Sequence, residues 1–540
     1  MKVCLLNESF PPVIDGVVNV VMNYADYLMK DHAAEVIIGT PNYPGADYTS
    51  YPYRVIPYHS FDTAAMTNGY RTGNPFAGRE VQEMAAFSPD IIHSHCPASA
   101  TVIARLLREE TDAPIVFTYH TKYDIDIERF LRIKALADQG IKAMVSNIEA
   151  CDDIWVVSRG AGESLKALGF QGDYRVVNNG VDFAKGRVDA AKIAAAVEGY
   201  DLPEGIPVFL FVGRMMTYKN IPLILDALRM LSDAGQDFRM VLIGKGPDQE
   251  LLEKMAAERD LMDTAHSPGK CIFTGPIYDR DVLRAWNCRA DLFLFPSTFD
   301  TNGLVVREAA ACGLASVLVE GSCAAEGITD GRNGFIIQET AASMAELLKK
   351  LTKEPDRMHD VGQHAMDEIY LSWQTCVSEA YDRYQWVLEE KKRGAFAGRK
   401  KMPTDYLVSM TAHSMSEQER RRRIRKEIFG DFRDSAVGMM ENIQEAEENV
   451  ESLLERIRSD LQDAGDRAEE YMHRKKAEAR ESIKKGSEKI GHFMEERAAE
   501  AEEFRQKSSE RFDRYLEQRA EEAAKYMNLK ELQDAEESGE

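Results

Sequence analysis

Short apolar runs alternate with helical stretches over residues 1–372, and this pattern constrains the fold more than any other feature of the chain. Continuous apolar runs are typical of parallel strands that helices cover on both faces. The alternation therefore predicts a doubly wound α/β architecture. The predicted strands are Lys2–Asn7, Glu35–Gly39, Asp90–His93, Pro114–Tyr119, Asp153–Ser158, Val208–Gly213, Arg239–Gly244, Asp291–Phe295, Ala315–Val319 and Phe335–Ile337.

These strands are too many for one open sheet, and a chain of 540 residues is too long for a single core. The segment 180–205 is predicted to be a linker, and Pro203–Pro207 restarts the pattern. We therefore predict two Rossmann-like domains, at 1–195 and 200–372, that face each other across a cleft.

Residues 415–540 differ from the rest, because they hold 25 Lys/Arg and 34 Asp/Glu but no Cys, Trp or Pro. Such a composition predicts a long charged helical tail rather than a globular domain. From Ile443 to Tyr471, apolar residues recur at spacings of mostly three and four, as in a coiled-coil seam. The pattern favours a solvated helix hairpin or a loose coiled coil, and it leaves self-association through the tail open.

A basic run at the start of this tail supports a second interpretation. The run Arg420–Lys426 is followed by Ile428, Phe429 and Phe432. Basic clusters beside aromatic residues are attracted to anionic membrane surfaces. The segment 420–432 is therefore a candidate for peripheral contact with an anionic membrane.

Charge and composition argue against several classes of protein. The net charge of −23 is unlike that of a nucleic-acid-binding chain, because phosphate contacts need a basic face. The sequence contains no run of 18 apolar residues, the length needed to span a bilayer, and its N-terminal apolar run is too short for a signal peptide. The eight cysteines are scattered without a CxxC pair, as is typical of free thiols in a reducing compartment. We expect a cytoplasmic protein that does not bind nucleic acid.

Polar residues gather where predicted strands of the first domain end, which is where α/β folds bind ligands. Gly16 stands at the entry of the first helix, where a ligand can approach backbone N–H groups. His120 follows the strand that ends at Tyr119, within a polar cluster. The pair His93 and His95 could ligate a metal, but no matching Cys/His cluster occurs elsewhere, so an ordinary strand end is favoured.

The second domain places two cations after a strand. Arg214 and Lys219 lie five positions apart, following the strand that ends at Gly213. Arg can chelate two phosphate oxygens and Lys adds a point charge, so a phosphate-binding loop is favoured over ordinary surface charges. Gly244, at another strand end, would let a base or ribose approach the backbone, although a turn alone could explain it.

The segment 295–309 carries the strongest signal. Asp300 and Glu308 lie eight positions apart, and Gly303-Leu304-Val305 between them is predicted to open a helix. Free N–H groups at that helix end, together with the two cations, would suit a diphosphate, and the two acids would suit sugar hydroxyls. The alternative is a capping Asp and an exposed Glu, but Glu308 is embedded in a mostly apolar helix.

In their order along the chain, these motifs resemble family 4 retaining glycosyltransferases of the GT-B fold. The resemblance covers residues 1–390 and includes Gly331–Phe335 and Ser372-Trp373. It implies that the domain at 1–195 faces the acceptor and that the domain at 200–372 binds a nucleotide sugar. It also implies that a helix at 373–393 crosses back and packs on the N-terminal domain.

The resemblance implies a cradle for the donor diphosphate. Arg214 and Lys219 would hold the diphosphate, and Gly16 would approach it from the first domain. The amides that complete the cradle would be those of Gly303, Leu304 and Val305. This cradle contains no metal, because the cations are side chains.

Further roles follow from the same resemblance. Asp300 would bind hydroxyls of the transferred sugar, and Glu308 would bind the ribose. His120 would lie beside the sugar, near the reacting bond. Ile277 would lie close to the base. We therefore predict His120, Arg214, Lys219 and Asp300 as catalytic residues and the others as substrate-binding residues.

Two positions depart from the family pattern, since Asp300 stands where Glu is usual and Asn302 where Phe is frequent. The Asp300-Thr301 start and the stretch His120–Tyr123 are nonetheless similar to diacylglycerol glucosyltransferases, whose further Tyr is replaced here by Asp126. The resemblance therefore implies transfer of a hexose, glucose from UDP-glucose, to a membrane lipid such as diacylglycerol. It implies no cofactor beyond the nucleotide sugar, and a place at the inner face of the cell membrane.

The cradle indicates a mechanism, because fixed cations and N–H groups stabilise the charge that builds on a leaving diphosphate. We predict a metal-independent hexosyltransferase, and retention would mean front-face attack with the leaving phosphate as base. A soluble or polyprenyl-linked glycan acceptor stays open, as does a non-catalytic helical scaffold on the same core. Phosphorylase-like cleavage would need a pyridoxal lysine site that the sequence does not reveal.

Overall fold

The computed structural model describes residues 1–13, 15–63, 70–122, 134–262 and 269–396, with a few short stretches beyond them. The chain divides into two units, Met1–Met402 and Pro403–Glu540. Of the second unit only 405, 408–412, 414–416, 474, 477 and 481 are described. The predicted coiled-coil seam and the basic run at 420–432 therefore lie outside the described residues.

The first domain is built on a seven-stranded sheet in the order β3-β2-β1-β6-β7-β8-β9, with every pairing parallel. Its strands are β1 (Lys2–Leu6), β2 (Glu35–Pro41), β3 (Arg54–Tyr58), β6 (Ile91–Ser94), β7 (Ile115–Tyr119), β8 (Asp153–Val156) and β9 (Arg175–Val176). Its helices are α1 (Gly16–His32), α2 (Gly78–Ala86), α3 (Ser99–Thr111), α5 (Lys134–Glu149) and α6 (Arg159–Ala167). A short antiparallel pair, β4 (Ser60–Phe61) and β5 (Thr72–Gly73), stands apart from the sheet.

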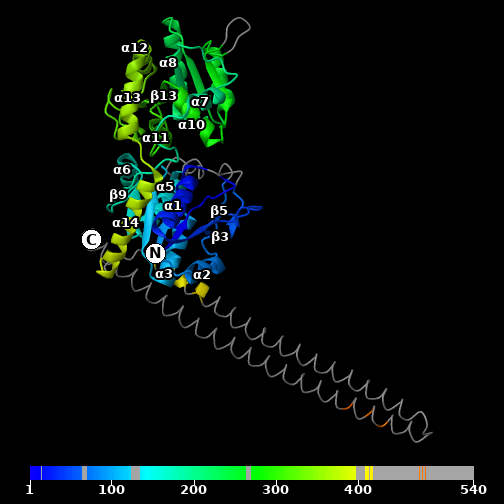
Figure 1. Cartoon of the computed structure of the whole chain (residues 1–540). Helices are drawn as coiled ribbons and strands as arrows, with labels where there is room; N and C mark the ends of the chain where they lie inside the picture. The colour runs from blue at the N-terminus through cyan, green and yellow to red at the C-terminus, as the bar shows by residue number, and fades with distance from the viewer. Residues whose placement is uncertain are drawn as a thin grey trace, which may run out of the picture. The chain divides into compact units, whose positions relative to one another are not determined.

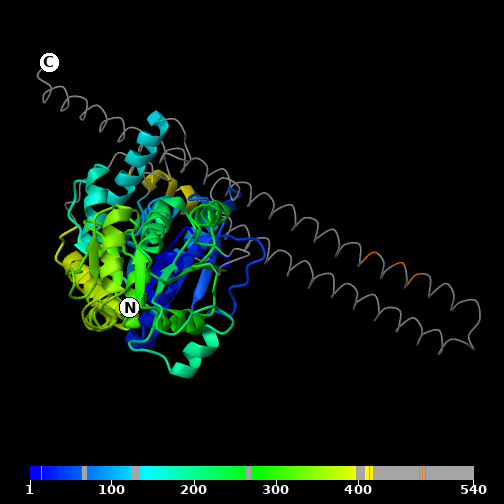
Figure 2. The ribbon, with the colours of Figure 1, turned by 90° about the horizontal axis from the view of Figure 1, so that it is seen from above.

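The second domain holds a six-stranded parallel sheet in the order β12-β11-β10-β13-β14-β15. Its strands are β10 (Val208–Val212), β11 (Arg239–Ile243), β12 (Cys271–Gly275), β13 (Leu292–Phe295), β14 (Ser316–Val319) and β15 (Phe335–Ile337). Its helical elements are η1 (Thr217–Lys219), α8 (Ile221–Asp233), α9 (Gln249–Glu258), α10 (Arg280–Arg289), α11 (Leu304–Ala311), η2 (Cys323–Ala325), α12 (Ala341–Leu351) and α13 (Pro355–Glu368). Helices lie on both sides of the sheet, with α8 and α12 packed together on one side (Figures 1 and 2).

The predicted α/β architecture with two parallel sheets is confirmed, and burial explains why most strands could be read from the sequence. All residues of β7, β10 and β11 are buried, as continuous apolar runs predict. The prediction missed β3, β9 and β12, which are edge strands of the two sheets. These three strands are covered on fewer sides than central strands, carry polar or exposed residues, and lack a continuous apolar run.

The chain passes between the domains twice, and the two crossings lie side by side. The N–H of Val181 donates to the carbonyl of Leu371 at 3.0 Å. A Cβ at Gly180 would lie 2.5 Å from the backbone nitrogen of Trp373, so only glycine fits this contact. The helix α14 (Trp373–Lys392) then packs on α1 in the first domain's core, where its Tyr384 is fully buried (Figure 1).

The predicted linker at 180–205 is not an irregular connection throughout. It contains the helix α7 (Ala190–Ala196), whose Ile193 packs with Leu202 against the core of the second domain. The helix has no fully buried residue. Its weak apolar pattern explains why the sequence suggested a linker.

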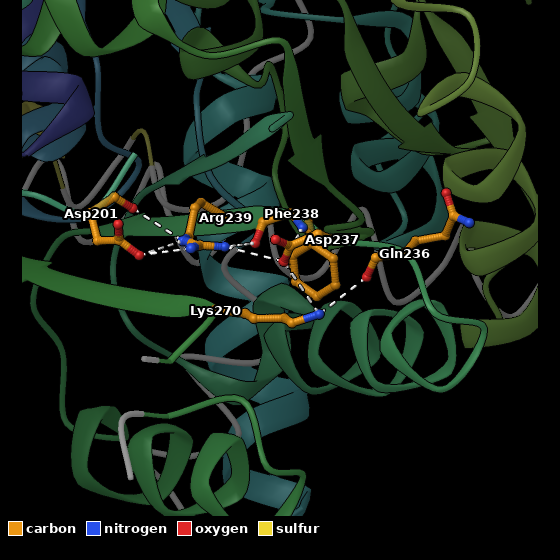
Figure 3. A network of polar contacts seen from close by, with 6 residues as sticks. All are labelled: Asp201, Gln236, Asp237, Phe238, Arg239 and Lys270. Atoms are coloured by element: carbon orange, nitrogen blue, oxygen red, sulfur yellow. Dashed lines mark hydrogen bonds and ion pairs between the residues drawn. The ribbon is translucent and has the colours of Figure 1, made fainter. Parts of the chain in front are cut away.

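The amino-terminal end of β11 is held by an ionic network (Figure 3). The buried guanidinium of Arg239 donates to Asp201 Oδ2 at 2.7 Å and to Asp237 Oδ1 at 3.2 Å. Lys270 reaches the same Asp237 at 3.4 Å and lies over the ring of Phe238. The network therefore ties the segment before the second sheet to two neighbouring strands.

Replacing Arg239 with alanine is expected to lower the free energy of unfolding by about 2 kcal/mol, because it removes charge-assisted hydrogen bonds from a buried site. The control is Lys254→Ala, whose partner Glu258 is 3.9 Å away on an exposed helix face. Such a pair contributes less than about 1 kcal/mol. Urea unfolding of both variants measures the difference, and equal losses would contradict this role for Arg239.

Candidate functional site

Loops from the carboxyl ends of both sheets meet at one place. Thr301, which follows β13, donates its hydroxyl to the carbonyl of His120, which follows β7. Ser158, which follows β8, donates to the carbonyl of Thr301 at 2.5 Å. Lys122 donates to the carbonyl of Thr298 at 3.2 Å. The structure thus brings the predicted acid block of the second domain against the predicted histidine segment of the first.

Lys219 and Asp300 are paired with each other. The Nζ atom of Lys219 lies 2.8 and 3.0 Å from the two carboxylate oxygens, and the side chains are only 12% and 24% exposed. Ser297 also donates its hydroxyl to Asp300 Oδ2 at 2.6 Å. An ammonium has three donors and a carboxylate about four acceptor directions, so each group keeps capacity for a ligand.

Among the described residues, Arg214 is an unpaired cation near the carboxyl ends of the first domain's strands. It is exposed and makes no hydrogen bond or ion pair with a residue that the structure describes. Burial raises the pKa of Tyr70, the charge of Asp15 raises it further, and the charge of Arg214 opposes both. Tyr70 donates to Asp15 Oδ2 at 2.9 Å, and Asp15 is the N-cap of α1. The effect of Arg214 on Tyr70 therefore puts the guanidinium near the start of α1.

The start of α1 is open, as the sequence predicts. Gly16 is the first residue of the helix, and a Cβ added there would meet no atom of a described residue within 4 Å. Asp15 caps the helix by accepting from the N–H of Val18 at 2.8 Å. The cap could have been predicted, because an Asp directly before a helical glycine is a capping signal. The contact of Tyr70 with Asp15 was not predicted.

The helix α11 begins at the predicted place and without a side-chain cap. Its N-cap residue Gly303 has a φ of 62°, and a Cβ there would lie 3.0 Å from the Cβ of Ala324, so glycine is required on both counts. The first-turn N–H groups, including those of Leu304 and Val305, are available to an anion. Ser158 of the first domain and Gly303 line a small pocket at this helix end.

Glu308 is mostly buried and paired. Arg280 donates to Glu308 Oε1 at 2.6 Å and lies over the ring of Phe183. Burial raises the pKa of Glu308, and Arg280 opposes this rise. The exposed-acid alternative is therefore wrong. Arg280 could not be predicted as the partner of Glu308, because the two residues come from different helices.

The two predicted base-binding positions, Gly244 and Ile277, also have packing roles. Gly244 has a φ of 147°, and a Cβ there would lie 1.9 Å from the carbonyl oxygen of Gly213. It allows the loops after β10 and β11 to touch. Ile277 is half-buried against the core of the second domain, whereas the adjacent Tyr278 is 84% exposed. The exposed aromatic ring next to Ile277 is therefore that of Tyr278, which was not among the predicted site residues.

The histidines at the first sheet's edge are buried. The Nδ1 atom of His95 lies 2.9 Å from Nε2 of His120, and burial lowers the pKa of His120 to about 3. His93 contacts Tyr384 and Thr118. Within the described residues, no three His, Cys, Asp or Glu side chains are grouped so that they could hold a metal ion.

Comparison with known families adds to this geometry. The profile of "Glycosyltransferase Family 4" matches residues 14–185, and that of "Glycosyl transferases group 1" matches residues 194–367. The chain belongs to the family 4 glycosyltransferases. It is similar to diacylglycerol glucosyltransferases.

This glycosyltransferase is 27% identical to the sulfoquinovosyl transferase of Arabidopsis thaliana over 72% of its own length and 75% of the relative's. It is 23% identical to the alpha-monoglucosyldiacylglycerol synthase of Acholeplasma laidlawii, over 68% of its own length and 92% of the relative's. It is therefore a transferase of a family whose members include glycolipid-forming enzymes.

Solved structures support the fold. Anabaena HepE in complex with UDP and glucose aligns with a TM-score of 0.56 at 16% identity, covering 72% of this chain and 100% of that one. Sucrose-phosphate synthase from Thermosynechococcus elongatus aligns with a TM-score of 0.59 at 18% identity, covering 72% and 99%. The two parallel-sheet domains of this glycosyltransferase therefore have the GT-B fold. Among its described helices, none is both long and apolar enough to cross a membrane.

Proposed function

We propose that this glycosyltransferase moves glucose from UDP-glucose to a membrane lipid such as diacylglycerol, with retention of the anomeric configuration. The observation that carries the proposal is the gathering of Arg214, Lys219 and the uncapped start of α11 at the carboxyl ends of the strands. The choice of lipid is supported by the similarity to the alpha-monoglucosyldiacylglycerol synthase of Acholeplasma laidlawii.

The cationic residues act on the leaving diphosphate. Lys219 directs its remaining N–H toward the diphosphate while Asp300 holds the ammonium in place. Arg214 is unpaired among described residues and can chelate two phosphate oxygens. The first-turn N–H groups of α11 add the positive end of a helix dipole. As the sugar–phosphate bond breaks, these fixed groups stabilise the growing negative charge, which lowers the barrier.

The acids act on the sugar and ribose. Asp300 keeps acceptor capacity for one sugar hydroxyl beyond its bonds to Lys219 and Ser297. Glu308 accepts a ribose hydroxyl beside its bond to Arg280. In front-face attack, the leaving phosphate takes the proton of the acceptor hydroxyl, so no protein carboxylate becomes a nucleophile.

We propose that the reaction needs neither a metal nor another cofactor, since side-chain cations take the place of a divalent ion. The test incubates the purified full-length protein with a panel of nucleotide sugars and with diacylglycerol vesicles, a soluble glycan or a polyprenyl-linked glycan as acceptor, in EDTA and again with added Mn²⁺ or Mg²⁺. The expected product is a glucosylated diacylglycerol, formed with UDP-glucose and with no other nucleotide sugar of the panel. A product formed only with a soluble or polyprenyl-linked glycan would overturn the lipid assignment, and activity restored only by Mn²⁺ or Mg²⁺ would overturn metal independence.

The basic run Arg420–Lys426 is proposed to dock on anionic lipid. Replacing its five arginines and its lysine with glutamine is expected to weaken binding to vesicles that contain anionic lipid, because each cation near such a surface contributes about 1 kcal/mol. Raising the salt concentration should weaken wild-type binding in the same way. The control replaces Lys484, Lys485 and Lys489, which lie further along the tail. Equal co-sedimentation of wild type and the glutamine variant would refute the docking.

A further inference from the structure

Two buried histidines share a hydrogen bond at the carboxyl edge of the first sheet. His95 follows β6 and is fully buried, and His120 follows β7 and is 6% exposed. Nδ1 of His95 lies 2.9 Å from Nε2 of His120, and the rings are stacked at 21°. Burial lowers the pKa of both residues, so both rings are neutral at neutral pH. A single proton therefore lies between the two nitrogens.

The surroundings of Nε2 of His95 determine which of the two rings carries that proton. Nε2 of His95 is buried and has no hydrogen-bond partner among described residues. If His120 donated from Nε2, His95 would carry its own proton on Nε2 as a buried N–H without an acceptor. In the opposite arrangement only a lone pair is unpaired. Buried donors without partners are rarer in folded proteins than under-satisfied acceptors.

The described neighbours of His95 cannot supply an acceptor for such a proton. Both ring nitrogens of His93 are already used, by Tyr384 at 2.5 Å and by Thr118 at 2.7 Å. The ring of Tyr24 meets His95 at 5.7 Å, and an N–H contact with an aromatic ring is a weak interaction. The ring of His93, with its centroid 4.0 Å away, limits how far His95 can turn.

We propose that His95 is a positioning residue that donates Nδ1–H to His120 and thereby fixes the proton of His120 on Nδ1. That Nδ1 makes no hydrogen bond with a described residue. His120 then offers a donor, not a base, to whatever oxygen lies beside it. The identity of that oxygen, an oxygen of the transferred sugar or of the reacting bond, rests on the proposed function. The tautomer does not.

The tautomer can be measured without substrate. The full-length protein, labelled with ¹⁵N-histidine, gives two-bond ¹H–¹⁵N correlations whose pattern distinguishes Nδ1–H from Nε2–H, and the spectrum of His120→Gln identifies the His120 signals. We expect Nδ1–H for His120. Nε2–H would overturn the proposal. Since the readout needs no donor, failure of the UDP-glucose assignment would leave it intact.

Matched substitutions at His95 test the consequence for catalysis. An Asn side chain places its amide nitrogen near the position of Nδ1, whereas Gln places it near Nε2. His95→Leu is expected to lower kcat by about 10-fold through loss of a buried hydrogen bond, and Asn but not Gln should recover most of that loss. Rescue by Gln alone, or wild-type kcat in the Leu variant, would contradict the positioning role. If the variants fail to fold, the wild-type spectrum still decides the tautomer.

Discussion

Replacing Lys219 with methionine is expected to lower kcat/KM for the donor by a factor of about 100–1000, which corresponds to about 2.7–4 kcal/mol of lost transition-state stabilisation. Methionine keeps much of the side-chain volume but removes the charge that faces the leaving diphosphate. Arg214→Met should lower kcat/KM by a factor of the same order. The Arg214 guanidinium makes no hydrogen bond or ion pair with a described residue, so its loss should affect the diphosphate and not the fold. The measurement is steady-state kinetics with UDP-glucose.

The matched control for this prediction is Lys245→Met. Lys245 is an exposed lysine that follows β11 at the same edge of the second sheet, and it has no part in the proposed cradle. Its loss should change kcat/KM little. Near-normal kinetics in both Lys219→Met and Arg214→Met would contradict the cradle, as would an equal loss in the control. Thermal melting of each variant separates loss of folding from loss of catalysis.

Replacing Gly244 with alanine is expected to destabilise the second domain by about 3 kcal/mol or more, since a new Cβ would overlap a backbone oxygen and the positive φ adds strain. The neighbouring atom is the carbonyl of Gly213, 1.9 Å from the added Cβ, and a backbone atom cannot turn aside. Donor binding should weaken too, because the loop displaced is the one that precedes Arg214.

Gly235→Ala isolates the contribution of the clash. Gly235 also has a positive φ, of 75°, but a Cβ there would meet no atom of a described residue within 4 Å. It should therefore cost only about 1 kcal/mol, the strain of a left-handed conformation without overlap. Urea unfolding of the two variants gives the comparison. Similar losses would mean that Gly244 is required only for its backbone conformation.

Local patterns allowed much of the architecture to be predicted. Strands such as β7 and β10 are buried over their whole length, so their apolar runs stand out in the sequence. The edge strands β3, β9 and β12 lack this signal. The helix start at Gly303 was also readable, because a glycine after a strand and before an apolar run marks both a turn and a helix end.

The pairing of site residues could not be predicted in the same way. Lys219 and Asp300 are 81 positions apart, and Arg280 and Glu308 are 28 apart. Each pair forms only because folding brings two loops or two helices together, and no periodicity encodes that. The contact between His95 and His120 is of the same kind. Strand ends indicated which residues gather at the site, but not which of them bind each other.

A crystal structure of the full-length protein with UDP would test the donor cradle most directly. We predict that the diphosphate lies within hydrogen-bonding distance of the Arg214 guanidinium, the Lys219 ammonium and the first-turn amides of α11, and that Glu308 contacts the ribose. A diphosphate bound away from these groups, or held by a metal ion instead of the two side-chain cations, would contradict the account.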